Sequence, residues 1–457
     1  MSSRLRHPLV AVSLAVALTL PWFLSWASGT NTSFATLITV AVSGLAVLGA
    51  SFLLAWGAET AEKDVPRAFA LAVLAVLAVA PEYAVDALYA WTAGANIGTP
   101  RGAEAANLAV ANMTGANRIL IGIGWSAIAV FTVYKAHSTN DPAVERRSGF
   151  LGDVVHLDRD ISTEITFLLA ATTFAFFVPF SAATFTGGGS MGGIGVLDTV
   201  VLVGLYALYI GIIVRGDVEG HEQQVGVPAY FQGYRKPKRI ATVLLLFAFS
   251  GLLILTAVEP FAHGLEKLGQ QAGVPPFFMI QWVAPLASES PELIVVAYLV
   301  NKARSTAGFN ALISSKLNQW TLLIGTLAVV YSIAAGQVAA LPFDQKQVAE
   351  IWITAGQSFF AIAILTNFEI SVREAVVLFG LFITQVVAEF VVIRTVAEPF
   401  ASTYSLYMLY GYTVVYLLLA VALFVSRRDD LRWLFGRTRA TAREAIGGTE
   451  ASADHAD

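Results

Sequence analysis

Long apolar stretches alternate with short polar segments along the whole chain. Windows of roughly 19 residues pick out twelve segments that are hydrophobic enough to cross a bilayer. They are about 8–25, 34–56, 69–94, 105–134, 165–184, 196–214, 240–261, 276–299, 309–334, 348–366, 375–393 and 406–425. Because backbone groups in lipid must be satisfied internally, and barrel strands would be shorter and alternating, we predict helices. The predicted class is an all-α polytopic membrane protein with about 12 transmembrane helices.

The composition supports this class and excludes others. Charged residues make up 13% of the 457 residues, against roughly 25% in an ordinary soluble domain. The net charge of -4 gives no reason to expect a nucleic-acid partner, so we expect the lipid bilayer and transported ions. The sequence has no Cys and no GxxxxGK[ST] phosphate loop, which argues against thiol chemistry, Cys-bound metal and ATP-driven transport.

The distribution of Lys and Arg predicts the orientation. Of the 28 basic residues, 22 fall on one side of the twelve spans and 4 on the other. The positive-inside rule therefore places both termini in the cytoplasm, and a prokaryotic inner membrane suits the sequence. The first span also resembles a signal peptide, but its length and the position of Trp22 and Trp26 favour a retained helix.

Two of the apolar spans each carry a pair of acidic residues. Glu82 and Asp86 are four residues apart in the third span, and Glu289 and Glu292 are three apart in the eighth, so each pair shares a helix face. Ionisable groups inside a membrane are costly unless they are paired, hydrated or ligating, which makes each a candidate functional residue. Ser288 adds a hydroxyl oxygen beside the second pair. The alternative interpretation is that a Pro-Glu pair merely begins a helix at the membrane surface.

The two acidic spans carry the same Pro-Glu pair in opposite orientations. Pro81-Glu82 lies in span 3 and Pro291-Glu292 in span 8, and an odd number of spans separates them. Inverted repeats of this kind build ion sites where broken helices meet at the bilayer midplane. Oxygen-only ligands suit hard cations such as Ca²⁺ or Na⁺. We therefore expect a cation site formed by both spans, with prolines breaking the eighth helix.

The span after each acidic span is rich in amides, hydroxyls and glycine. Neutral oxygen ligands are candidates here, although such side chains also join neighbouring helices by hydrogen bonds. Each of these spans contains one basic residue, which we expect either to compensate the carboxylates or to pair locally. The candidates are Asn112, Asn117 and Arg118 in the fourth span, and Ser315, Lys316 and Asn318 in the ninth.

These motifs resemble the calcium/cation antiporter superfamily, which includes the sodium/calcium exchangers. The Pro-Glu pairs match its two repeats, and residues 111–117 match the Asn, Gly and Asn positions of its GNxxGSN-like stretch. In the second repeat the counterpart is residues 314–316, or Asn318 if the register moves by two. Departures are Ala111, Ala116, and Arg118 and Lys316 beside the ligand positions. The resemblance implies that Glu82 and Glu292 bind the cation.

The resemblance also implies an organisation of the chain. A ten-helix core would consist of two inverted five-helix repeats, with one extra helix at each end. The expected parts are 1–33, an N-terminal tail and extra helix; 34–214, the first repeat; 215–239, a cytoplasmic loop; 240–393, the second repeat; 394–426, an extra last helix; and 427–457, a cytoplasmic tail.

The function that follows is secondary active cation antiport by alternating access. The transported substrate would be Ca²⁺ or Na⁺, exchanged against Na⁺ or H⁺, with no cofactor. A monovalent cation/proton antiporter is the first alternative, and a non-transporting membrane protein with a degenerate site is the second. No metalloprotease or serine-hydrolase motif lies in a span, so we do not expect an enzyme. Whether the chain forms a homo-oligomer is open at this point.

Overall fold

The computed structural model describes residues 7–65, 79–139, 141–180, 192–215 and 225–453. In these residues, eleven helical segments are long and apolar enough to cross a membrane, and each overlaps a predicted span. The third predicted span lies partly in residues 66–78, outside the described residues, and continues as α5 (Ala80–Ala95). The predicted all-α polytopic class is therefore confirmed, and the chain is an integral, multi-pass membrane protein.

The chain divides into two compact units, and three helices contribute to both. Unit 1 comprises residues 1–89, 111–116 and 221–292, and unit 2 comprises residues 90–110, 117–220 and 293–457. The boundary falls within α5, α6 (Pro100–Ile119) and α14 (Ala284–Val300). These are the helices that carry the two Pro-Glu pairs and the Asn-Gly-Asn stretch.

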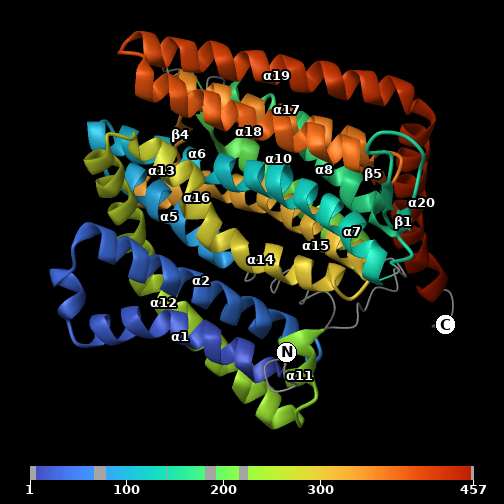
Figure 1. Cartoon of the computed structure of the whole chain (residues 1–457), viewed down its shortest axis with the longest axis horizontal. Helices are drawn as coiled ribbons and strands as arrows, with labels where there is room; N and C mark the ends of the chain where they lie inside the picture. Colours follow the sequence, from blue (N-terminus) through green and yellow to red (C-terminus); the bar gives the residue numbers. More distant parts are fainter. Residues whose placement is uncertain (1–6, 66–78, 140, 181–191, 216–224, 454–457) are drawn as a thin grey trace. The chain divides into compact units, whose positions relative to one another are not determined.

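Unit 1 is built around three helices that run side by side: α1 (Pro8–Ala27), α2 (Thr36–Ala61) and α12 (Lys236–Ala272) (Figure 1). Leu53 and Trp56 pack against Phe231 and Leu246 in its apolar core, and Trp22 is buried with its indole N–H donating to Thr256. Its remaining helices are shorter. The helices that lie wholly in this unit are α1 (Pro8–Ala27), α2 (Thr36–Ala61), α11 (Gly226–Gln232), α12 (Lys236–Ala272) and α13 (Pro276–Trp282), with a 3-10 turn at Thr30–Ser33.

Asp64 and Arg239 tie the end of α2 to the start of α12. The guanidinium donates Nε to Oδ2 and Nη2 to Oδ1 of Asp64, at 2.6 Å each. These bonds hold the pKa of the Asp64 carboxyl below its usual value. Within residues 215–239, which we predict to be a cytoplasmic loop, α11 occupies Gly226–Gln232 and α12 begins at Lys236.

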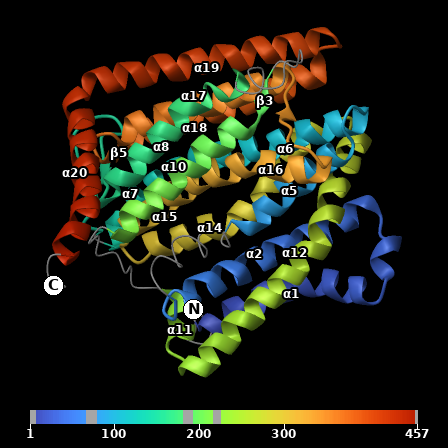
Figure 2. The ribbon, with the colours of Figure 1, turned by 180° about the vertical axis from the view of Figure 1, so that it is seen from behind.

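Unit 2 is organised around α17 (Gln345–Leu365), the most deeply buried of the eleven segments. This helix packs between α8 (Ser162–Ala175) and α19 (Phe400–Ser426) (Figures 1 and 2). The other helices of the unit are α7 (Ser126–Thr139), α10 (Val196–Arg215), α15 (Ser305–Asn318), α16 (Ile324–Ala335), α18 (Val372–Thr395) and α20 (Arg428–Ala453), with a 3-10 turn at Arg159–Ile161.

Two small antiparallel sheets connect loops of unit 2. One has the order β1-β2-β5, with Val144 opposite Val155 and Ile370 on its other side. The second pairs β3 with β4, with Ile194 opposite Leu341. The strands are β1 (Val144–Glu145), β2 (Val154–His156), β3 (Gly193–Ile194), β4 (Leu341–Pro342) and β5 (Glu369–Ser371).

The predicted break in the eighth span lies earlier than its prolines suggested. Helix α13 ends at Trp282 and α14 begins at Ala284, whereas Pro291 lies inside a continuous α14. Pro285 is the second residue of α14, where a missing N–H costs nothing because first-turn N–H groups have no helical partner. The break therefore precedes the acidic pair and leaves Glu289 and Glu292 on one uninterrupted helix.

Candidate cation-binding site

The acidic candidates gather in unit 1. Glu82 and Asp86 lie on the first two turns of α5. Pro81 is the second residue of this helix, a position where proline is favoured. Glu289 and Glu292 lie on α14. Glu82, Asp86 and Glu289 are all buried, and Glu292 is partly exposed. Carboxyl groups this deep in an apolar segment need compensation, which a bound proton or cation provides.

The clearest ligand geometry in this unit is the pair formed by Asp86 and Asn112. The Asn112 amide donates Nδ2 to Asp86 Oδ1 at 2.9 Å, and both side chains are fully buried. The remaining oxygens, Asp86 Oδ2 and Asn112 Oδ1, accept no hydrogen bond from any described residue. Buried polar atoms are nearly always satisfied, so two adjacent unsatisfied oxygens indicate a place for a cation or a protonated group.

Glu82 and Glu289 lie within hydrogen-bonding reach of each other, with Glu292 and Asp86 as further carboxyl neighbours. Two carboxyl groups can hydrogen-bond directly only if they share a proton. A cation that displaces this proton would bind the same oxygens. Ser288, the hydroxyl candidate, is half-buried and donates to the Pro285 carbonyl at 3.3 Å.

Gly115 lets the backbone of α6 approach that of α13. A Cβ atom at this position would lie 1.8 Å from the carbonyl oxygen of Gln281. The contact continues through Thr114, whose hydroxyl accepts from the Gln281 amide at 3.4 Å. The Gly in the Asn-Gly-Asn stretch is therefore a packing requirement, and it fixes Asn112 on the preceding turn.

We expect Gly115→Ala to destabilise the protein by about 3 kcal/mol or more, because a backbone atom must move to admit the methyl group. Gly251→Ala is the matched control: it also lies in a unit 1 helix, but no atom lies within 4 Å of the added carbon. That variant should be neutral or slightly stabilising. The midpoint of thermal unfolding in detergent measures both, and equal midpoints would contradict the packing role of Gly115.

The candidates of unit 2 surround a buried lysine. Lys316 is fully buried on α15, and its ammonium donates to Asn117 Oδ1 at 2.7 Å and to the Asn117 carbonyl at 3.4 Å. It also lies 4.3 Å from the centre of the Trp320 ring. Asn318 is buried at the end of α15, and Ser315 is half-buried. The Asn117 amide oxygen, a predicted ligand, is thus held by the Lys316 ammonium.

Arg118 has its charge partner inside unit 2. Its guanidinium donates Nη1 to Glu350 at 3.0 Å, Nε to Gln357 at 3.3 Å and Nη2 to Gln385. The side chains of Arg118 and Glu350 are both fully buried. Gln357 returns a bond from Nε2 to the Arg118 carbonyl at 3.2 Å. The positive charge of Arg118 is therefore compensated locally, by the carboxylate of Glu350 on α17.

The network extends to a second carboxylate, Glu389, which belongs to none of the sequence motifs described above. Gln385 donates Nε2 to Glu389 at 2.9 Å, and Glu389 accepts from Lys346 at 3.1 Å and from Ser405 at 3.3 Å. Glu389 is fully buried, like Glu350. Both glutamates fall in predicted spans, so the depth criterion that selected Glu82 could also have found them.

A π-helical segment follows the candidate residues in each amide-rich span. The first is Leu120–Trp125, directly after α6, and the second is Gln319–Leu323, directly after α15. Segments of this kind inside α-helices are frequent at functional sites. Gly122 lies in the first, where an added Cβ would meet the Phe382 ring at 2.4 Å. Each segment directly follows the helix that carries the candidate residues of its span.

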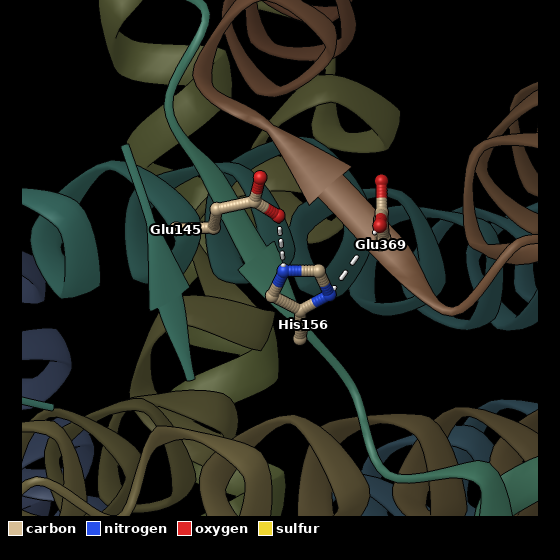
Figure 3. Close-up of side chains that lie close together, drawn as sticks. All are labelled: Glu145, His156 and Glu369. Atoms are coloured by element: carbon tan, nitrogen blue, oxygen red, sulfur yellow. Dashed lines mark hydrogen bonds and ion pairs between the residues drawn. The ribbon is translucent and has the colours of Figure 1, made fainter. Parts of the chain in front are cut away.

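A second cluster lies apart from these residues, on the β1-β2-β5 sheet of unit 2. The ring nitrogens of His156 face Glu145 at 2.8 Å and Glu369 at 3.3 Å (Figure 3). Arg147 donates to Glu145 at 2.8 Å and to Glu369 at 2.9 Å. The bond from Arg147, and after it the bond to His156, lower the pKa of Glu145 to about 2. A metal ion could use the three ligands only by displacing the guanidinium. We interpret the cluster as a set of ion pairs that joins two loops of unit 2.

Comparison with known families identifies the class of protein. The family model described as "Sodium/calcium exchanger protein" matches residues 35–215 and 242–391. The chain belongs to this family of cation antiporters. The two matched regions contain α5, α6, α14 and α15, on which all the candidate residues lie.

Solved structures give a more specific likeness. The crystal structure of the H⁺/Ca²⁺ exchanger CAX is 41% identical, covers 95% of this chain and 98% of its own, and superimposes with a TM-score of 0.80. The native structure of YfkE is 13% identical, covers 82% of this chain and 98% of its own, and has a TM-score of 0.55, which shows a shared fold. The comparison with curated protein sequences gave no match.

Proposed function

We propose that this antiporter moves Ca²⁺ across the membrane in exchange for protons. The observation that carries the proposal is the group of four carboxyl residues on α5 and α14, three of them buried, with two oxygens, at Asp86 and Asn112, that accept no hydrogen bond from the described residues. Carboxylate and amide oxygens suit a hard divalent cation. The 41% identity to an H⁺/Ca²⁺ exchanger over nearly the whole chain supports the same substrates here.

Coupling follows from competition for the same oxygens. Glu82, Glu289 and Asp86 bind protons when no cation is present, and Ca²⁺ binding requires their release. Glu292 contributes a fourth carboxylate, and Ser288 and Asn112 add neutral oxygens. In unit 2, Asn117, Ser315 and Asn318 are the further candidate ligands. Lys316 and Arg118 supply positive charge in unit 2, and the charge of Arg118 is balanced by Glu350.

The same reasoning weighs against the alternatives. A monovalent cation needs less negative charge than the four carboxyl groups supply, and the identity to CAX does not favour it. A degenerate site would not explain why Asp86 and Asn112 each bury an oxygen that accepts no hydrogen bond within the described residues. The relatives found are exchangers, and no part of the proposal requires an enzymatic step or a cofactor.

The proposal includes an arrangement in the cell. Both termini lie in the cytoplasm of a prokaryotic cell, because most Lys and Arg residues fall on that side of the spans. The core consists of two inverted repeats, 34–214 and 240–393, and the paired π-helical segments support this relationship. The bilayer and the transported ions are the partners.

Flux through reconstituted vesicles tests the proposal. We expect Ca²⁺ to accumulate in proteoliposomes with an acidic lumen, and a protonophore to stop the uptake because it collapses the proton gradient. Protein-free liposomes are the control, and Na⁺ and K⁺ are tested in parallel. If a sodium gradient alone drove Ca²⁺ uptake, the counter-ion would be Na⁺ rather than the proton. Exchange of Na⁺ or K⁺ but not of Ca²⁺ would overturn the substrate assignment.

A further inference from the structure

The helix α20 lies at the level where several spans of unit 2 end. It begins at Arg428, and only Arg427 separates it from the end of α19 at Ser426. The intervening Arg427 donates to the carbonyls of Ala363 and Ile364 near the end of α17, and it pairs with Glu374 in the first turn of α18. The start of α20 is therefore fixed beside the end of α17 and the beginning of α18, both of which are long and apolar enough to span the membrane.

From this point α20 runs across the ends of α8 and α10 (Figures 1 and 2). Its protein-facing side consists of Leu434, Thr438, Thr441 and Ala445, which are buried and follow one another at spacings of four, three and four residues. Thr438 Oγ1 bonds to Thr166 Oγ1 at 2.8 Å, which anchors the helix on α8. The helix therefore lies on the bundle as an integral part of unit 2.

The opposite side of α20 carries arginines. Arg428, Arg432, Arg439 and Arg443 are exposed, and their spacings of four, seven and four residues place them on one face. Arg432 pairs only weakly with Asp429, since both side chains are more than three-quarters exposed. A stripe of four guanidinium groups at the headgroup level favours negatively charged partners.

An exposed aromatic side chain borders this stripe. Phe435 follows Arg432 by three residues and precedes Arg439 by four, and 47% of it is exposed. Trp433, two residues earlier, points to the other flank, where it packs against Phe368 at 5.3 Å and Arg159 at 5.0 Å. One flank of α20 is thus filled by protein, while the Phe435 flank is open beside the arginines.

We propose that α20 is an interfacial helix that binds anionic phospholipid headgroups through Arg428, Arg432, Arg439 and Arg443, with Phe435 inserted at the acyl boundary. The combination of a basic face, an adjoining aromatic side chain and a fixed position at the membrane surface is the physical basis of such binding. The ligand is the lipid phosphate, which the bilayer around the protein supplies.

The absence of Cys from the chain allows a direct test with single nitroxide labels. Phe435→Cys and Gly436→Cys place labels on consecutive exposed residues that face different directions, and Gly436 has open space around its Cα. In vesicles containing phosphatidylglycerol, we expect the label at 435 to be accessible to oxygen and shielded from a water-soluble nickel complex. The label at 436 should show the reverse.

The lipid dependence tests the role of the arginines. In the triple variant Arg432→Gln, Arg439→Gln, Arg443→Gln, the fraction of phosphatidylglycerol needed for half-maximal shielding at 435 should rise at least about tenfold. Its ion flux should be unchanged, which shows that it is folded. Equal water access at 435 and 436 would overturn the proposal. So would equal shielding in phosphatidylcholine alone, or in the triple variant, because insertion would then not depend on anionic headgroups.

Discussion

Replacing Glu82 or Glu292 with Gln is expected to abolish Ca²⁺/H⁺ exchange while leaving expression and folding intact. Gln keeps the shape of the side chain and removes the negative charge that the cation needs. Gln also cannot bind and release a proton, so both the Ca²⁺ step and the proton step of the exchange cycle are lost. The fall in exchange rate should be on the order of a hundredfold or more, since a buried divalent cation is left with an uncompensated charge.

Ca²⁺ uptake driven by a proton gradient in proteoliposomes measures this effect. Glu259→Gln is the matched control: Glu259 lies on α12 in the same unit, but its side chain is 66% exposed. That variant should exchange at the wild-type rate. Unimpaired exchange in both Glu82→Gln and Glu292→Gln would refute the assignment of these residues as cation ligands.

The second large effect is expected at Arg118. Removing its charge by Arg118→Met leaves Glu350 ionised and fully buried without its 3.0 Å partner. Breaking a buried ion pair on one side costs about 3–5 kcal/mol, whereas removing both charges is often close to neutral. We therefore expect Arg118→Met to lower the stability strongly and the double variant Arg118→Met, Glu350→Gln to recover most of the loss.

Thermal unfolding in detergent gives the comparison. Arg101→Met is the control, because Arg101 is exposed and its loss should change stability by less than about 1 kcal/mol. If Arg118→Met unfolds at the same temperature as Arg101→Met, the buried pair does not contribute as described. If the double variant is no more stable than the single one, the two residues are not energetically coupled.

The sequence predicted the membrane-spanning helices well because lipid imposes one simple rule on them. Each backbone group must be bonded within its own segment, so length and hydropathy suffice to locate a helix. Glu82 and Glu292 stood out for a related reason, since a carboxyl group in an apolar run is costly. Helix α20 was outside the reach of this rule: it is rich in charge and is stabilised by packing on α8.

The partners of Arg118 could not be predicted from local patterns. Glu350 and Gln385 are more than 230 residues away in the chain, and only the packing of α17 and α18 beside α6 brings them together. The bond from Arg118 to Gln357 could not be predicted for the same reason. Glu350 and Glu389 nevertheless carried a readable signal, because both lie within apolar spans. Applied to every span, the depth criterion would have predicted a second buried charge cluster.

The two π-helical segments also have a consequence for the direction in which side chains point. Such a segment holds about one residue more than the same length of α-helix, and one residue corresponds to a rotation of roughly 100°. In the first of these spans, the residues before Leu120 and those after Trp125 are therefore rotated relative to a regular helix. Deleting one residue from the segment would turn Asn117 away from its present direction while preserving the helix. Each amide-rich span thus contains an angular offset that sets the direction of its polar end relative to its apolar end.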